Sequence, residues 1–239
     1  MNHTSPPNTD AATQLAPRRA SLRPIDTGQT DRTLGRARHH PAFVQLYYAL
    51  EARRTEEGSI VVQFIAPSAG AGTTTIASGY ARVAAAEQSK PALYIDCSGG
   101  PARRPPLEPP SLHEVYCRCS RMREAVAPAS ETDNLGWARL CAGLQPLLQV
   151  SGEHLRVILD ELRSRYSIIV LDCPAATSPD AAALTRFSDG TILVAATART
   201  RESEIQRART LIQRMGGQVA GLVLTRVSLA LSGPVVPAR

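Results

Sequence analysis

The spacing of apolar residues alternates between two patterns along this chain, and these patterns predict its strands and helices. Near-continuous apolar runs of strand length occupy residues 59–65, 92–95, 167–172, 191–195 and 219–227. Between them, apolar residues recur three and four positions apart, as on one face of a helix. Such helical spacing covers residues 41–53, 74–87, 152–165, 181–187 and 202–215. We therefore expect strands and helices to alternate from residue 41 onward.

This alternation predicts the fold class. The run "SIIVLD" at residues 167–172 is apolar almost throughout, which is typical of a strand that is buried on both faces. Alternating strands and helices form an α/β fold, a doubly wound and mostly parallel sheet with helices on both faces. A sheet of this kind binds ligands at the carboxyl ends of its strands. Candidate chemistry is therefore sought at those ends.

The pattern is weaker between residues 99 and 141. Five prolines lie within residues 99–110, which we expect to form a loop. Ser111 and Glu114 fit a capping box and predict a helix that continues to about Val126. Residues 134–141 predict a short strand.

The two ends of the chain lack both spacings. Residues 1–40 are rich in Pro, Thr, Ser, Asp and Arg, so we expect a disordered tail, and residues 229–239 predict a short C-terminal tail. One domain, residues 41–228, remains in a chain of 239 residues with 43% apolar residues, enough for a sizeable core. No run approaches the roughly 20 apolar residues of a spanning helix, and no signal-peptide core is present, so we expect a cytoplasmic protein.

Charge and cysteine content exclude few of the candidate functions. The net charge is +6, and Lys90 is the only lysine, so arginine supplies nearly all the positive charge. Arginines such as Arg156, Arg163 and Arg165 lie on an amphipathic helix and predict a solvated face. Because no aromatic residues interleave with them, we do not expect nucleic-acid binding. Five scattered cysteines predict reduced thiols.

A glycine-rich segment after the first strand carries the candidate chemistry. In "APSAGAGTTTIASGYARVAA", Gly70 and Gly72 precede a helix, and missing side chains there let backbone N–H groups approach phosphate oxygens. Thr74 stands where a hydroxyl would bind Mg²⁺. Asp96 and Asp172 each end a strand, where carboxylates can hold Mg²⁺ or its water shell. The residues predict a nucleotide site at this edge of the sheet.

A longer segment carries a family resemblance. The string "RYSIIVLDCPAATSPDAAALTRFSDGTILV" resembles the cytoplasmic domain of bacterial tyrosine kinases of exopolysaccharide export, within the MinD/ParA group of P-loop NTPase-like proteins. The resemblance extends from about Pro41 to Val227. It implies that Asp172 is the Walker B aspartate and that Asp96 is the first aspartate of an extra Walker motif. It also implies ATP or ADP with Mg²⁺ as ligands, and a transmembrane polysaccharide co-polymerase, or chain-length determinant, as partner.

The loop departs from the family's pattern. The family reads Pro-Gly-Glu-Gly-Lys-Ser/Thr-Thr, and the corresponding residues here are Ala69, Gly70, Ala71, Gly72, Thr73, Thr74 and Thr75. Thr73 therefore replaces the phosphate-binding lysine. The superfamily's additional lysine would fall at Ser68, and a second aspartate of the extra motif would fall at Ser98.

Further departures lie near the two ends of the domain. Thr225 stands where the family has a strand-final asparagine that contacts adenine. In "PAFVQLYYAL", Pro41, Val44 and Tyr47 replace a glutamate and two arginines of the family's oligomerisation helix, which leaves homo-oligomers open. The end of the chain, "SLALSGPVVPAR", has no tyrosine cluster to be phosphorylated.

These losses predict a kinase-like subunit that is catalytically impaired. A lysine–phosphate contact contributes roughly 1.5 to 3 kcal/mol to binding, and one cation at a transferring phosphate contributes about 10³ to 10⁵ in rate. We expect weak or absent nucleotide binding. We also expect a role in exopolysaccharide or capsule synthesis and export, with the protein held at the inner membrane by the co-polymerase. Two alternatives stay open. One is an active tyrosine autokinase completed by partner residues, or by Arg103 or Arg104; the other is a MinD- or ParA-like positioning ATPase.

Overall fold

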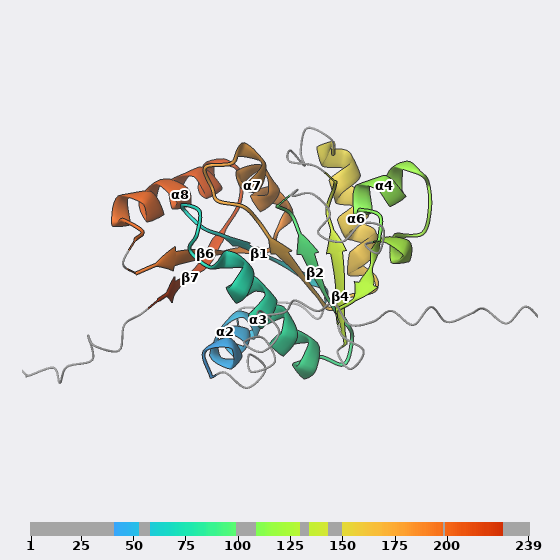
Figure 1. The fold of residues 1–239 in the computed structure, drawn as a ribbon, viewed down its shortest axis with the longest axis horizontal. Helices are drawn as coiled ribbons and strands as arrows, with labels where there is room; N and C mark the ends of the chain where they lie inside the picture. Colours follow the sequence, from blue (N-terminus) through green and yellow to red (C-terminus); the bar gives the residue numbers. More distant parts are fainter. Residues whose placement is uncertain are drawn as a thin grey trace, which may run out of the picture.

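The centre of the molecule is a seven-stranded sheet (Figure 1). The computed structural model describes residues 41–52, 58–98, 109–129, 134–142, 150–197 and 199–226. Its strands are β1 (Ile60–Ile65), β2 (Ala92–Asp96), β3 (Ala127–Pro128), β4 (Leu135–Arg139), β5 (Ile168–Asp172), β6 (Gly190–Ala196) and β7 (Val219–Thr225). They lie in the order β3-β4-β2-β5-β1-β6-β7, and every neighbouring pair except β3–β4 is parallel. The predicted α/β fold class is confirmed.

Helices cover both faces of this sheet, as the continuous apolar strands require. One face carries α2 (Pro41–Glu51) and α3 (Thr73–Glu87) (Figure 1). The other carries α4 (Leu112–Cys117), the 3-10 turn η2 (Met122–Ala125), α6 (Gly152–Arg163), α7 (Pro179–Ala183), the 3-10 turn η3 (Leu184–Phe187) and α8 (Glu202–Arg214). Two apolar cores result, one on each side of the sheet.

Strand β1 shows how one sequence serves both cores. Its residues alternate between the α6 side, with Val61 and Ile65, and the α3 side, with Val62 and Phe64. Gln63 is fully buried on the α6 side, and its amide donates a hydrogen bond of 2.8 Å to the carbonyl oxygen of Ala181. Because its side-chain oxygen also accepts from Thr191 Oγ1 at 3.1 Å, this buried polar group is satisfied.

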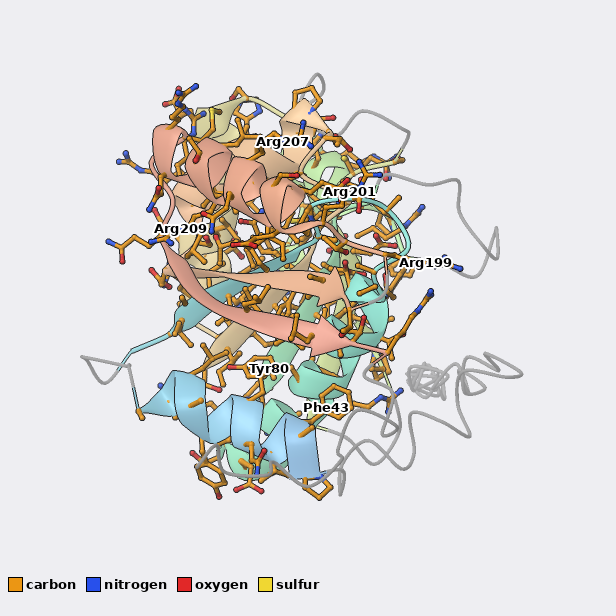
Figure 2. The ribbon with its side chains drawn as sticks, turned by 90° about the vertical axis from the view of Figure 1, so that its left-hand side faces the viewer. Phe43, Tyr80, Arg199, Arg201, Arg207 and Arg209 are labelled. Atoms are coloured by element: carbon orange, nitrogen blue, oxygen red, sulfur yellow. The ribbon has the colours of Figure 1, made fainter. Side chains whose placement is uncertain are left out.

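Helix α2 joins the domain by packing on α3. The ring of Phe43 lies against Gly79, where an added Cβ would be 2.5 Å from the ring atoms Cε1 and Cζ. Glycine is needed there because the two helices approach so closely. Nearby, Tyr47 of α2 packs at 6.3 Å between ring centroids on Tyr80, which itself packs on Phe64 of β1. Figure 2 shows Phe43 on α2 and Tyr80 next to that helix.

The predicted helix from Ser111 to about Val126 is wrong in its length. The capping box is present, since Glu114 N–H donates to Ser111 Oγ and Ser111 N–H donates to the Glu114 carboxylate. The helix ends at Cys117, Cys119 adopts a left-handed φ of 51°, and only a 3-10 turn follows. The intervening Arg118 and Cys119 are exposed and Ser120 is polar, so these residues do not hold a further turn against the sheet.

Arginines occupy two kinds of position. Figure 2 shows Arg201, Arg207 and Arg209 around α8, where they are exposed, as expected for a solvated face. Arg163 differs from that prediction, because it donates to the Ser59 carbonyl at 2.8 Å and forms an ion pair of 2.9 Å with Asp189. Asp189 also accepts from the backbone N–H of Val61 at 2.6 Å, so Arg163 fastens the start of β1 to the start of β6.

The predicted tails and nearly all of the proline-rich loop lie outside the described residues. Within the described residues, no helix has the length and apolar character needed to cross a membrane. The extent of the domain, residues 41–228, therefore stays a prediction at its two ends.

Candidate functional site

The glycine-rich loop leaves the carboxyl end of β1 and turns directly into α3. Gly70 and Gly72 both adopt left-handed conformations, with φ of 81° and 91°. An added Cβ at Gly70 would meet nothing within 4 Å, so backbone conformation rather than crowding selects glycine there. The two glycines turn the chain so that Gly72 becomes the N-cap of α3.

The first turn of α3 presents backbone donors and no side-chain cap. Gly72 supplies no capping side chain, and the first intrahelical bond is donated by Ile76 N–H to the Gly72 carbonyl. The N–H groups of Thr73, Thr74 and Thr75 precede that bond, so they have no helical acceptor. Together with the helix dipole, such groups favour an anion. The loop therefore keeps the backbone features of a phosphate site, while Thr73 contributes no positive charge.

Thr225, at the end of β7, holds the loop from the side. Its hydroxyl donates a hydrogen bond of 2.7 Å to the carbonyl oxygen of Ala71. Its methyl carbon lies 3.9 Å from where a Cβ on Gly72 would sit. The structure thus gives Thr225 a positioning role in the loop, and its contact with adenine stays a prediction.

The two strand-end aspartates lie side by side. Asp96 on β2 and Asp172 on β5 are register partners, so their side chains leave the same face of the sheet at the same edge. Asp172 is 4% exposed. Asp96 is half-buried, and its Oδ1 accepts a hydrogen bond of 2.8 Å from the backbone N–H of Ser98. The two aspartates therefore lie together at one edge of the sheet, and their roles at a nucleotide site stay a prediction.

The segment that follows β5 runs beside the loop. Cys173 N–H donates to the Phe64 carbonyl at 3.0 Å, and Ala176 N–H donates to the Ala66 carbonyl at 2.7 Å. These bonds tie the first residues after the Asp172 strand to the last residues before the glycines. Two backbone hydrogen bonds therefore hold the segment after Asp172 beside the start of the loop.

A tyrosine that the sequence analysis did not place at the site completes this corner. The hydroxyl of Tyr94 on β2 donates a hydrogen bond of 2.6 Å to Asp172 Oδ2. Burial raises the pKa of Tyr94 well above its ordinary value, and the charge of Asp172 raises it further, so Tyr94 is a neutral donor. The one available sequence signal was alternation, because Tyr94 and Asp96 are two residues apart and share a face.

Three buried thiols lie at the same edge but on the opposite face. Cys97 and Cys173 follow the two aspartates, and Cys141 follows β4. A hydrogen bond with Cys173, together with burial, raises the pKa of Cys97 well above its ordinary value. Burial raises the pKa of Cys141 to about 12. All three cysteines are free, and the raised values at Cys97 and Cys141 keep those two in the neutral form, which is a poor nucleophile.

In this arrangement the oxygen donors fit a resident Mg²⁺ poorly, because one oxygen of each strand-end carboxylate already accepts a hydrogen bond from the protein. A cation beside such a loop takes ligands from the loop hydroxyl and from a strand-end carboxylate. Here Thr74 is exposed, Asp96 is engaged by Ser98, and Asp172 accepts a short bond from Tyr94. Among the described residues, no group of three or more His, Cys, Asp or Glu side chains could hold a metal ion.

Comparison with sequences of known proteins gives a partial match. No protein-family model matches the chain. CapB from Staphylococcus aureus, a relative that is named as a tyrosine-protein kinase, is 30% identical over 81 residues. The matched part is 34% of this chain and 36% of CapB, so it spans about a third of that relative's length.

Solved structures match over most of the chain. The chimerical protein CapA2B2 superposes with a TM-score of 0.67 at 18% identity, covering 77% of this chain and 83% of that one. The kinase domain of the Escherichia coli tyrosine kinase ETK gives a TM-score of 0.63 at 17% identity, covering 80% of this chain and 76% of that one. The fold is that of bacterial tyrosine kinase domains. The resemblance stated from the sequence is thereby confirmed.

The same fold extends to P-loop ATPases. The septum site-determining protein MinD of Pyrococcus horikoshii, complexed with Mg-ADP, gives a TM-score of 0.52 at 17% identity. The match covers 70% of each chain. Neighbours of this fold thus bind a nucleotide with Mg²⁺, which supports testing this chain for the same ligand.

Proposed function

We propose that this protein is a kinase-like cytoplasmic subunit of exopolysaccharide or capsule synthesis and export that has lost autonomous phosphoryl transfer. The observation that carries the proposal is Thr73, which stands at the first helical position of α3, where the family places its phosphate-binding lysine. The loop around it keeps both left-handed glycines. The shape of a nucleotide site is therefore retained without the cation that stabilises a transferring phosphate.

A membrane co-polymerase of the chain-length determinant kind is the proposed partner. Two comparisons support this partner. CapB is similar in sequence to part of this chain, and the chimera CapA2B2 has the same fold. In this proposal, the protein attaches to the inner membrane through that partner and controls polysaccharide length or secretion by docking.

Phosphoryl transfer by the purified protein tests the loss of catalysis. The protein is incubated with its co-polymerase and γ-labelled ATP, beside an Asp172→Asn variant. We expect no labelled protein above the background of that variant. Transfer that is present in the native chain and abolished by Asp172→Asn would overturn the proposal. A Thr73→Lys variant in the same assay shows how far the missing charge accounts for the loss.

Deletion of the gene tests the cellular role. Loss of the protein should change the amount or the length distribution of surface polysaccharide, and the native gene should restore it. Unchanged polysaccharide in the deletion strain would separate this chain from polysaccharide synthesis, whatever the outcome of the transfer assay.

One observation keeps an autokinase as the second candidate. Of the six tyrosines, Tyr48 on α2 is 55% exposed, whereas Tyr47, Tyr80 and Tyr94 are buried. Tyr48 donates to Glu87 at 3.0 Å on the surface, so a kinase could reach its hydroxyl. Mass spectrometry of protein co-expressed with the co-polymerase would detect phosphate on Tyr48 if this candidate is correct.

A further inference from the structure

Two carboxylates stand at adjacent strand ends, and each accepts a hydrogen bond from a donor within the protein. Asp96 and Asp172 are register partners, so their like charges lie on one face and repel. Asp96 accepts from the backbone N–H of Ser98. Asp172, which is almost fully buried, accepts from the hydroxyl of Tyr94. A buried carboxylate requires such a partner, because burial removes the water that would otherwise solvate it.

The bond between Tyr94 and Asp172 is short and well enclosed. Its oxygen–oxygen distance of 2.6 Å falls in the range of hydrogen bonds from a hydroxyl to an ionised carboxylate. Tyr94 is 7% exposed, and its ring packs in the core beneath α3. Strand β2 pairs directly with β5, and the packing of the ring in this core holds the hydroxyl beside Asp172. Releasing Asp172 to a cation would strand the phenol hydroxyl in this apolar core.

We propose that Tyr94 is an internal replacement for the cation at this site, so that its hydroxyl engages Asp172 in place of a hydrated Mg²⁺. The protein then holds its loop and strand ends in the native arrangement without metal. This inference rests on the proposed function in taking the site to be non-catalytic, and it adds the residue that closes the site to metal. It also means that binding of Mg-nucleotide meets two separate obstacles: Thr73 supplies no positive charge, and Tyr94 engages Asp172.

The two obstacles make a paired prediction. Thr73→Lys alone restores a charge for the phosphates but leaves Asp172 engaged, so it should not restore Mg²⁺-dependent binding. Tyr94→Phe alone removes the hydrogen bond from the phenol hydroxyl to Asp172 while keeping the ring that fills the core. The double variant should bind ADP about tenfold more tightly with Mg²⁺ than in EDTA. Calorimetric titration with ADP measures this for all three variants and the native chain.

Thermal unfolding provides a readout that needs no nucleotide. Native protein should melt at the same temperature in EDTA and in excess MgCl₂. Tyr94→Phe should melt about 4 to 8 °C lower in EDTA and recover part of that loss in MgCl₂. Tyr166→Phe is the matched control, because Tyr166 precedes β5 at its amino end, away from Asp172, and Mg²⁺ should not affect it.

Two results would overturn the inference. One is a native protein whose melting temperature rises in MgCl₂ and loses that rise in Asp172→Asn, because Tyr94 would then yield to the metal. The other is a Tyr94→Phe protein that stays folded without any response to MgCl₂. If Tyr94→Phe fails to fold, the native protein decides, with Asp172→Asn as its control: equal melting temperatures of the native protein in EDTA and in MgCl₂ support the inference, and a rise in MgCl₂ that Asp172→Asn abolishes overturns it. The transfer assay above is independent, so failure of the proposed function is recognised separately.

Discussion

The loop after β1 and the carboxylate corner formed by β2 and β5 differ in opposite ways from the nucleotide site that the sequence resemblance predicts. The loop has the expected backbone, with Gly70 and Gly72 in left-handed conformations, but Thr73 carries no positive charge. The corner keeps its charges, Asp96 and Asp172, but engages them with donors from the chain itself. Backbone shape and side-chain charge are thus separable here, because the shape also starts α3, with Gly72 as its N-cap.

The largest effect should come from breaking the shape of the loop. Gly72→Val places a β-branched side chain at a φ of 91°, which we expect to lower the free energy of unfolding by about 2 to 3 kcal/mol. Gly58→Val is the matched control, since a Cβ there meets nothing within 4 Å, and little change is expected. Urea unfolding measures both. Equal losses in the two variants would show that the loop conformation has no special stabilising role.

The next largest effect should come from the corner. Tyr94→Phe removes a hydrogen bond to a buried carboxylate, and we expect a loss of about 2 kcal/mol in metal-free buffer. Tyr166→Phe, which removes a hydroxyl at the other end of β5, should cost less. If the two variants lose the same stability, the bond from Tyr94 to Asp172 does not differ from an ordinary tyrosine contact.

The corner also shows how far sequence reasoning reaches. Asp96 and Asp172 could be placed at one edge because parallel strands share a direction, and because both residues end apolar runs. The bond from Tyr94 could not be predicted, since it depends on β2 lying next to β5, and alternation along the chain does not fix strand order. A tyrosine in an apolar strand is typical of a core residue, and here the ring is core while the hydroxyl is polar.

The same limit explains the misjudged helix. The capping box of Ser111 and Glu114 predicted where α4 begins, because the cap is a local interaction. Its end at Cys117 depends on what the following residues can pack against in the fold. Arg163 is similar, because its ion pair with Asp189 joins residues that only the folded sheet brings together. Local chemistry was predictable, and pairings across the sheet were not.

A smaller loss of stability should come from Thr225, which anchors the loop, than from the glycines of the loop itself. Thr225→Val removes the hydrogen bond to Ala71 and keeps the side-chain volume, so we expect a loss of about 1 kcal/mol. Thr225→Ser retains the hydroxyl and should recover most of it. If serine is no better than valine, the hydroxyl of Thr225 does not stabilise the loop. Urea unfolding of both variants, together with hydrogen exchange at residues 70–75, reports the result.

The smallest effect concerns a carboxylate outside the site, which serves as a reference for Asp172. Glu114 accepts hydrogen bonds from the backbone N–H and the hydroxyl of Ser111, and the first of these lowers its pKa most. A lowered pKa in the folded state stabilises the protein above the unfolded value of about 4.3, and that contribution is lost as the pH falls through the folded pKa. Glu114→Gln should therefore cost about 0.5 kcal/mol at neutral pH and progressively less towards pH 3. Urea unfolding across that pH range measures the cost. A cost that does not depend on pH would mean that the charge of Glu114 contributes nothing to the stability of the cap. A carboxylate would then have to be buried, as Asp172 is, for its hydrogen-bond partner to affect stability through its charge.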